Sequence, residues 1–285
     1  MAGFDCIERG DAAYPLLLSL IPDPPARLWY AGDLSALAKP CVAVVGSRRS
    51  TEYGRWAAYT IGKRLSEYGV TVVSGMAEGI DTWAHKGCLA EKSPTIAVFG
   101  CGLDICFPRG NRGLMEQIAK AGLILSEYEE GMRPTKFSFP QRNRIISGLS
   151  YATVVVEAGF SSGSLITAEL ALDQGRAVYA VPGNINRMGS VGCNKLIADG
   201  ARPVVFIDDI LSGLGLKPDA AETLRKDLAP SERRLLSIVE VNGEIAYDRL
   251  AREAGLGIAD CVSAVTVLEM KGAVHTAAGK VFAAE

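Results

Sequence analysis

Short runs of apolar, often β-branched residues recur along the chain from about residue 42, and stretches with a helical pattern separate them. Within each run nearly every residue is apolar, which is typical of strands that helices cover on both faces of a parallel sheet. The predicted strands are residues 42–45, 70–74, 95–99, 123–126, 152–156, 177–181 and 203–206. The predicted helices are residues 52–68, 81–91, 110–121, 141–150, 164–174 and 192–199. This alternation predicts a Rossmann-like, doubly wound α/β domain with a mainly parallel sheet of about seven strands.

The segments outside this domain follow other patterns. The beginning of the chain is rich in proline, which predicts an N-terminal extension that packs on the sheet domain. After the last predicted strand, glycine, proline and charged residues follow one another closely, as is typical of a linker. The chain therefore divides into an extension, a Rossmann-like domain, a linker and a small C-terminal domain: residues 1–41, 42–211, 212–227 and 228–285.

The small C-terminal domain shows three helical patterns followed by two short strands, which is the order of a winged helix. We expect Ser231 to cap its first helix, which should end at Gly243, and its strands to turn at Ala278–Gly279. The third helix, within residues 258–272, has two acidic residues and a single basic residue at its end, which suits the phosphates of a DNA groove poorly. We therefore expect this domain to contact protein, either a partner or a second copy of the chain.

Composition narrows the class of protein. The longest apolar runs are far shorter than the roughly 20 residues that span a bilayer, and the N-terminus lacks the pattern of a signal peptide. We therefore expect no membrane span and a cytoplasmic location. The seven cysteines are scattered and odd in number, which indicates reduced structural thiols. Even the closest pair, Cys101 and Cys106, does not match the ligand spacing of a zinc site, so we expect neither a metal nor a cofactor.

The charge balance indicates that any anion must be bound locally. The formal net charge of the whole chain is −2. Residues 42–210 hold 18 Lys+Arg against 16 Asp+Glu, and residues 228–285 hold 6 against 8. Since neither part is strongly basic, a nucleic acid would have to be recognised by a few placed residues rather than by a generally positive surface.

Glycine-rich sequences follow most of the predicted strands, at the sheet edge where open parallel sheets bind ligands. Arg48, in GSRRS directly after the first strand, is therefore a candidate phosphate contact. Ser162, Gly163 and Ser164 begin a helix after the fifth strand, where free N–H groups can bind an anion and a serine can serve as N-cap. The sequence lacks GxGxxG and an acidic residue at the end of the second strand, which argues against an NAD enzyme.

The helix predicted near residues 141–150 carries positive charge at its already positive N-terminus. Pro140 suits the first helical position, and Arg142 and Arg144 follow in the first turn. Lys136 and Phe139 lie just before them. Cations beside an aromatic ring suit a single-stranded nucleic acid, since the charge contacts phosphates and the ring stacks on an unpaired base. In the alternative reading the rings are core and the arginines pair with acidic neighbours; the residues concerned are Phe137, Phe139, Glu127, Glu129 and Glu130.

Six short motifs occur along the chain, each of them once. They are GSR at 46–48, GMAEGID at 75–81, KFSFPQRNRIISGLS at 136–150, VVVEA with SGSLITA at 154–168, AVPGNI at 180–185 and GCNKLIADGA at 192–201. Together they resemble the DprA/Smf DNA-processing family over roughly residues 42–210, and the run FPxRNRIIxGLS is the most specific of them. The C-terminal domain resembles the winged helix that is often appended to this family.

This resemblance implies a protein that binds single-stranded DNA during natural transformation and helps load the RecA recombinase onto it. It also implies a homodimer whose core performs no known chemistry, so we expect no enzyme activity. The positions that match the family's DNA contacts are Arg48, Lys136 and Phe139, with a weaker correspondence for Arg142, Asn143, Ser162, Gly163 and Ser164. Asp81 of GMAEGID matches too, and we expect it to cap a helix. Residues 1–41 leave no room for the helical N-terminal domain that many relatives carry.

The main alternative is an enzyme. The same kind of core resembles nucleoside-monophosphate phosphoribohydrolases, for which Glu157 and Glu169 are the candidate carboxylates. Against this, the PGGxGT signature of that group is replaced here by FSSGSLIT. Nucleophilic catalysis has little support, because neither His85 nor His275 lies near a serine elbow in the sequence.

Overall fold

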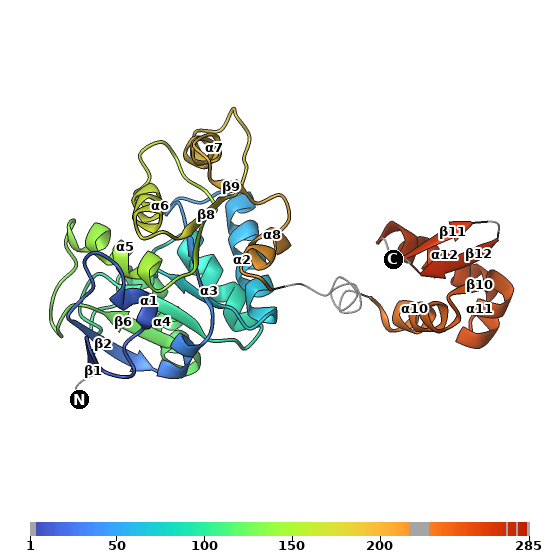
Figure 1. Ribbon diagram of the computed structural model, residues 1–285, viewed down its shortest axis with the longest axis horizontal. Coiled ribbons are helices and arrows are strands. Elements are labelled where there is room, and N and C mark those ends of the chain that lie inside the picture. The colour runs from blue at the N-terminus through green and yellow to red at the C-terminus, as the bar shows by residue number, and fades with distance from the viewer. Residues whose placement is uncertain (1–3, 217–227, 272, 278, 284–285) are drawn as a thin grey trace. The chain divides into compact units, whose positions relative to one another are not determined.

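The computed structural model of the chain defines residues 4–216, 228–271, 273–277 and 279–283 (Figure 1). Its contacts divide the chain into two compact units, residues 1–216 and residues 217–285, each with a hydrophobic core of its own. Most of the predicted linker, residues 217–227, lies outside the described residues, while Ser212 and Gly213 end helix α8 (Asp208–Gly213) of the first unit.

The first unit is built on a nine-stranded sheet. The strand order is β1-β2-β6-β5-β4-β3-β7-β8-β9, with β3 to β9 parallel and β1 and β2 antiparallel. The bounds are β1 Asp5–Glu8, β2 Arg27–Gly32, β3 Cys41–Val45, β4 Thr71–Ser74, β5 Thr95–Phe99, β6 Leu123–Ser126, β7 Ala152–Val155, β8 Ala177–Ala180 and β9 Arg202–Pro203. The predicted Rossmann-like, mainly parallel α/β fold is confirmed.

Two details of the predicted sheet are wrong. The sheet has nine strands rather than about seven, because the N-terminal extension adds β1 and β2 and pairs β2 with the edge strand β6. The strand predicted at residues 203–206 is almost absent. The backbone N–H groups of Val205 and Phe206 donate to the Asp209 carboxylate at 3.0 and 2.7 Å, and this turn leads the chain away from the sheet into α8.

Helices cover both faces of the sheet (Figure 1). Their bounds are α1 Leu16–Ser19, α2 Glu52–Glu67, α3 Ile80–Ala90, α4 Arg112–Ala121, α5 Ser138–Gly148, α6 Gly163–Asp173 and α7 Val191–Ala198. In β3, Val42 and Val44 share a core with α2, α3 and α8, whereas Ala43 and Val45 share a core with α5, α6 and α7. Because successive side chains of a strand point to opposite faces, a strand buried on both sides has the continuous apolar sequence seen here.

The order of the strands reverses between β3 and β7. From β3 the chain proceeds through β4, β5 and β6 on one side, and from β7 through β8 and β9 on the other. In open α/β sheets, ligands bind beyond the carboxyl ends of the strands at such a reversal. The loops after β3 and β7 are therefore the first place to look for a site.

The second unit is a winged helix, as predicted. Its elements are α10 Pro230–Asn242, β10 Glu244–Ala246, α11 Tyr247–Ala254, α12 Ile258–Met270, β11 Val274–Ala277 and β12 Lys280–Ala283, and its sheet has the order β10-β12-β11. The predicted cap Ser231 is wrong: the N-cap is Ala229, because Pro230 occupies the first helical position and Glu232 accepts from the Ala229 N–H at 2.9 Å. Of the predicted turn, Ala278 lies outside the described residues, and Gly279 has a φ of +74°.

Two further observations concern the part of the chain that the structure describes. No helix in it combines the length and apolar character needed to cross a membrane. No group of three or more His, Cys, Asp or Glu side chains in it is placed to hold a metal ion. All seven cysteines are free thiols, and burial raises the pKa of several of them, including that of Cys41 to about 12.

Candidate nucleic-acid interface

A cleft of about 640 Å³ opens at the carboxyl ends of the strands, at the reversal between β3 and β7. Its walls come from the loop after β3, the loop after β4, the start of α5 and the start of α6. All eight residues singled out in the sequence line it: Arg48, Lys136, Phe139, Arg142, Asn143, Ser162, Gly163 and Ser164. The fold thus brings together residues that lie more than 100 positions apart in the chain.

Arg48 is exposed on the loop after β3, and its charge is paired with no carboxylate of the described residues. The preceding residue anchors this loop, because the Ser47 N–H donates to the Glu157 carbonyl at 2.7 Å and the Ser47 carbonyl accepts from Ile80 N–H at 3.2 Å. Gly79 lets the next loop approach closely: it has a φ of +78°, and a Cβ there would lie 2.2 Å from the Ser47 carbonyl oxygen. The backbone therefore holds Arg48 at the mouth of the cleft.

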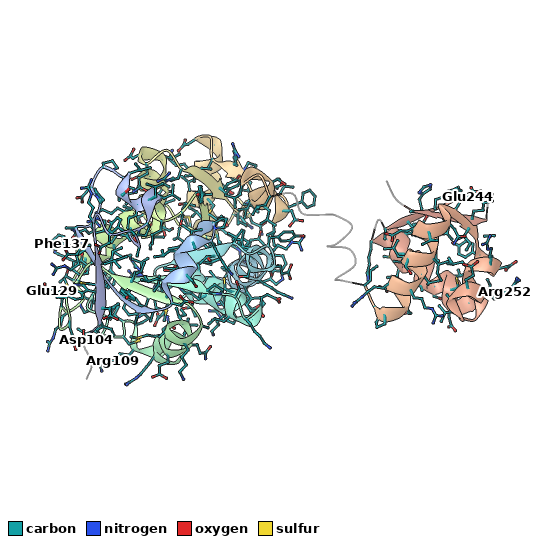
Figure 2. The ribbon with its side chains drawn as sticks, turned by 60° about the horizontal axis from the view of Figure 1, so that its bottom comes forward. Asp104, Arg109, Glu129, Phe137, Glu244 and Arg252 are labelled. Carbon is teal, nitrogen blue, oxygen red and sulfur yellow. The ribbon has the colours of Figure 1, made fainter. Side chains whose placement is uncertain are left out.

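Lys136 supplies a second free cation. It is exposed, forms no ion pair with any residue in the described ranges, and its Nζ lies 5.0 Å from the centroid of the Phe137 ring. Phe137 is 71% exposed and stands at the surface of the unit (Figure 2), so the alternative in which it belongs to the core is wrong. Phe139 is half-buried and faces the cleft.

Helix α5 begins earlier than predicted, at Ser138 rather than Pro140. Thr135 and Ser138 exchange hydrogen bonds at its start, each backbone N–H donating to the hydroxyl of the other residue at 3.1 Å. This reciprocal arrangement satisfies donors that the start of a helix otherwise leaves open. The first helical turn is thus fixed locally, and Lys136 lies on the loop that leads into it.

Arg142 lines the cleft as part of its floor and is not an exposed phosphate contact. It is only 4% exposed, and its Nη1 donates to the carbonyls of Gly75 and Val98. Burial lowers the pKa of its guanidinium to about 10, and the nearby Asp81 carboxylate opposes that shift. Asp81 is not the helix cap that the sequence suggested: Gly79 is the N-cap of α3, and Asp81 accepts from the N–H groups of Gly75 and Ala77 at 3.1 and 3.3 Å. Burial raises the pKa of Asp81.

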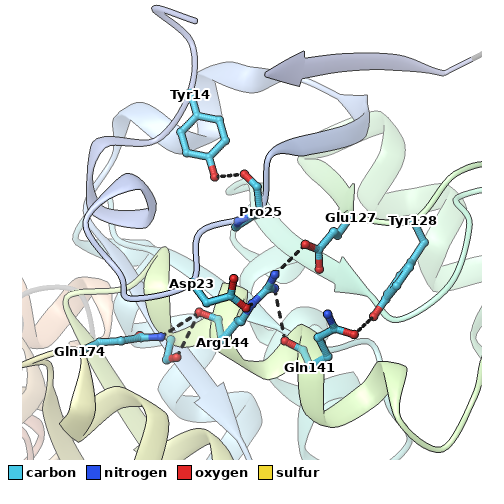
Figure 3. A network of polar contacts seen from close by, with 9 residues as sticks. Tyr14, Asp23, Pro25, Glu127, Tyr128, Gln141, Arg144 and Gln174 are labelled. Carbon is cyan, nitrogen blue, oxygen red and sulfur yellow. Dashed lines mark hydrogen bonds and ion pairs between the residues drawn. The ribbon is translucent and has the colours of Figure 1, made fainter. Parts of the chain in front are cut away.

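Arg144 lies outside the cleft, so its predicted place beside Arg142 at the interface is wrong. Its guanidinium forms ion pairs with Asp23 at 2.8 Å and with Glu127 at 2.6 Å (Figure 3). Burial disfavours its charge, but hydrogen bonds to Glu127 and Asp23 outweigh burial and raise its pKa. For this arginine the alternative reading, pairing with Glu127, is the correct one.

The start of α6 completes the cleft. Of the two serines that the sequence offers as N-cap, Ser162 and Ser164, the N-cap is Ser162. Its hydroxyl accepts from the Ser164 N–H at 3.5 Å and contacts the Ser164 hydroxyl at 2.8 Å. Asn143 of α5 donates to the Gly163 carbonyl at 3.4 Å and so joins the two helix starts. The N-terminus of an 11-residue helix thus points its partial positive charge toward the same space as Arg48 and Lys136.

The sequence reasoning missed Phe107. This residue is 43% exposed, lines the cleft, and its ring centroid lies 5.4 Å from that of Phe139 with an interplanar angle of 35°. A signal was present, because Phe107 follows the third predicted strand and therefore belongs to the same sheet edge as Arg48. Its place in the cleft depends on the course of a long loop, which apolar periodicity does not reveal.

The candidate carboxylates Glu157 and Glu169 do not meet in the cleft, and neither does His85. Glu157 accepts from the N–H and hydroxyl of Thr51 at 3.0 and 2.9 Å and lines a separate cavity of about 980 Å³, and Glu169 is exposed on α6. His85 is buried: its Nδ1 lies 2.7 Å from the Thr95 hydroxyl, and burial lowers its pKa to about 3. These positions give each of the three residues a local structural environment away from the cleft.

Comparison with known proteins gives consistent matches. Residues 5–215 match the family described as DNA recombination-mediator protein A, and residues 207–280 match the DprA winged helix domain. The chain is 46% identical over 202 residues to the DNA processing protein DprA of Streptococcus pneumoniae, covering 71% of each chain. It is 42% identical over 237 residues to protein Smf of Synechocystis, covering 81% of this chain and 59% of that protein's length.

Two solved structures are similar in fold and sequence. The X-ray structure of DNA processing protein A from Streptococcus pneumoniae matches with a TM-score of 0.71 at 44% identity and covers 73% of this chain and 74% of that one. DNA processing protein A from Helicobacter pylori, a protein described as having a unique single-stranded DNA binding mode, matches with a TM-score of 0.67 at 33% identity, covering 74% and 96%.

Proposed function

The chain belongs to the DNA recombination-mediator protein A family, and from this premise we propose that its first unit binds single-stranded DNA in the cleft beyond the carboxyl ends of β3 and β7. The observation that carries the proposal is the meeting of Arg48, Lys136 and the Ser162 helix start around one cleft lined by aromatic rings. The two cations have no carboxylate partner in the described residues, so a phosphate can take that place.

Single strands fit this arrangement better than a duplex. Aromatic rings line the cleft, among them the exposed ring of Phe107, and only unpaired bases can stack on such a face. The charge is also concentrated at a few positions of a chain whose net charge is −2, so binding should rest on a small number of phosphate contacts. Binding in this form needs neither a metal nor a nucleotide.

From the membership in this family we also propose a biological role for the whole protein. It comprises the loading of the RecA recombinase onto the bound strand during natural transformation, work as a homodimer in the cytoplasm, and binding rather than catalysis. Support for the last point is that the candidate carboxylates Glu157 and Glu169 lie outside the cleft. The relative of Helicobacter pylori supports the single-stranded substrate, because single-stranded DNA binding is described for it.

For the winged helix we propose a contact with protein. Its third helix, α12, exposes apolar residues, namely Ile258, Val262, Val267 and Met270, and has no basic residue within its bounds. Such a surface suits a protein better than a phosphate backbone. A chain ending at residue 216 should therefore keep most of its affinity for single-stranded DNA, and loss of most of it would refute this assignment.

The test of the proposed function is fluorescence anisotropy with labelled oligo-dT, repeated with unlabelled duplex competitor and with Lys136→Ala. We expect binding to single strands, weak competition by duplex, and weaker binding by the variant. The matched control is Lys120→Ala, since Lys120 is an exposed lysine on α4 that does not line the cleft. Equal affinity for duplex, or equal effects of the two lysine substitutions, would refute the proposal.

A further inference from the structure

The Phe139 ring has little free surface for a base. The guanidinium carbon of Arg48 lies 5.2 Å from its centroid and that of Arg142 lies 5.9 Å from it, while the Phe107 ring packs at 5.4 Å. At the end of β5, a Cβ on Gly100 would lie 3.0 Å from Cδ1 of this ring, so the backbone also approaches it closely. Phe139 is thus surrounded by two cations, a second ring and the sheet edge.

Phe107 has the free surface that Phe139 lacks. Its ring is 43% exposed and lines both the cleft and an adjoining pocket of about 140 Å³. A phenylalanine ring with this much surface open to solvent leaves a large part of its apolar area unburied. Its exposure is therefore available for a ligand.

The loop that carries Phe107 is anchored. Asn111, which is buried, donates from its side chain to the Met76 carbonyl and to the Thr82 hydroxyl, both at 2.9 Å. The Asn111 N–H donates to the Pro108 carbonyl at 3.1 Å, and the Cys106 thiol donates to the same oxygen at 3.3 Å. The ring is therefore presented by a fixed backbone, which reduces the entropy lost when a ligand binds.

The adjoining pocket suits a base better than a phosphate. Besides Phe107, Pro108 and Phe139, its charged lining residues are Glu78, Arg142 and Arg48. Arg142 is buried and its Nη1 already donates to two backbone carbonyls, whereas Arg48 also reaches the main cleft. The Glu78 carboxylate would repel a phosphate placed there, whereas a neutral base meets apolar walls. The main cleft, which Arg48 and Lys136 both line, is the better place for a phosphate.

We propose that Phe107 is the ring on which a nucleobase stacks, and that Phe139 is a positioning residue that holds the Arg48 guanidinium for the neighbouring phosphate. This inference rests on the proposed binding of single-stranded DNA and assigns separate tasks to the two rings. The cation–π contact between Arg48 and Phe139 fixes the charge, and the tilted contact between the two rings sets Phe107 beside it.

The experiment uses the full chain, a labelled oligo-dT, and an abasic oligonucleotide of equal length, which keeps the phosphates and lacks the bases. Phe107→Ala should weaken oligo-dT binding roughly 5- to 150-fold, which corresponds to about 1–3 kcal/mol, and should leave abasic binding and the salt dependence unchanged. Phe107→Leu should behave like Phe107→Ala, and Phe107→Tyr should restore binding, because stacking needs a ring and not only volume.

Phe139→Ala should show a different signature, matching that of Arg48→Ala. Both should weaken binding to both oligonucleotides and should reduce the slope of log affinity against log salt by about 0.7, the value for one lost phosphate contact on a single strand. Far-ultraviolet circular dichroism of each variant establishes that it is folded before binding is measured.

The outcomes separate this inference from the proposed function. If the wild-type chain binds no oligo-dT, both fail. If wild-type binding is normal and Lys136→Ala weakens it, but Phe107→Ala leaves oligo-dT binding unchanged or weakens abasic binding equally, only the assignment of Phe107 fails. A Phe139→Ala variant that loses affinity for oligo-dT alone, with an unchanged salt slope, would return the stacking role to Phe139 and overturn the assignment.

Discussion

Arg144 of α5 donates to the carboxylate of Asp23 at 2.8 Å and thereby joins the first helical turns of α5 to the N-terminal extension (Figure 3). Its second partner, Glu127, lies just beyond β6 and accepts at 2.6 Å. The Arg144 side chain is 9% exposed and the Glu127 side chain 20%. The cations near this helix start therefore differ in role: Arg144 connects three parts of the fold, whereas Lys136 is exposed at the cleft and open to a ligand.

Arg144→Met should destabilise the first unit by about 3 kcal/mol or more, because it leaves the Glu127 carboxylate largely buried without its partner. Guanidinium chloride unfolding followed by circular dichroism measures this loss, and the DNA salt slope of the folded variant should not change. Arg27→Ala is the control: its ion pair with Glu8 is exposed, so its loss should change stability little. A smaller slope for Arg144→Met would show that Arg144 contacts DNA after all.

Gly75→Ala should disturb the floor of the cleft. A Cβ at Gly75 would lie 2.3 Å from Nη1 of Arg142, so the guanidinium must move and lose its bonds to the carbonyls of Gly75 and Val98. We expect a lower free energy of unfolding and weaker binding of oligo-dT. Gly113→Ala is the control, since Gly113 lies in α4 with open space around its Cα and should gain up to about 1 kcal/mol from the better helix propensity. Two variants of equal stability would contradict the predicted clash.

His85 should make stability depend on pH. Burial lowers the pKa of His85 from 6.5 to about 3, and its Nδ1 donates to the Thr95 hydroxyl, which itself donates to the Val72 carbonyl. Its Nε2 is buried and has no hydrogen-bond partner in the described residues, so a proton there would create an unpaired buried charge. Between pH 6.5 and about 3, His85 is therefore protonated in the unfolded chain and neutral in the folded chain.

It follows that the free energy of unfolding should decrease as the pH falls from about 6.5 toward 3, by up to about 1.4 kcal/mol per pH unit. His85→Asn, which keeps a donor for Thr95, should remove this part of the slope between pH 6.5 and 5. Asp81, whose pKa burial raises, contributes with the opposite sign, but it is present in both proteins, so their difference isolates His85. Parallel stability curves for the two proteins would contradict the neutral, buried state of His85.

Strands buried on both faces could be predicted from the sequence, because nearly every residue in them is apolar. The strand at residues 95–99 was predicted to the residue, since each of its positions is buried against a helix. β1 and β2 could not be predicted in this way, because their exposed, partly buried and buried positions are mixed. They join the sheet through pairing along its edge, β2 with β6, which lies nearly 100 residues later in the chain. The strand predicted at 203–206 does not form beyond Pro203, because the backbone N–H groups of Val205 and Phe206 donate to the Asp209 carboxylate instead of to a neighbouring strand.

Only some residues of the candidate site could be predicted from the sequence. Arg48, Lys136 and Ser162 could be found because each follows a recognisable strand or begins a helix at the ligand edge. The difference between Arg142 and Arg144 could not, because it depends on Asp23, more than 100 residues earlier in the chain. A pattern of charges along one helix does not say which of them meets a partner from another segment.

The central claim is that Arg48 and Lys136 face a nucleic-acid backbone, and the salt dependence of oligo-dT affinity tests it most directly. For wild type, Arg48→Ala, Lys136→Ala and the double variant, the slope of log affinity against log salt should fall in magnitude by about 0.7 for each cation removed. Lys120→Ala should leave the slope at the wild-type value. Slopes that do not differ among the five proteins would show that neither side chain touches the strand, and would contradict the account.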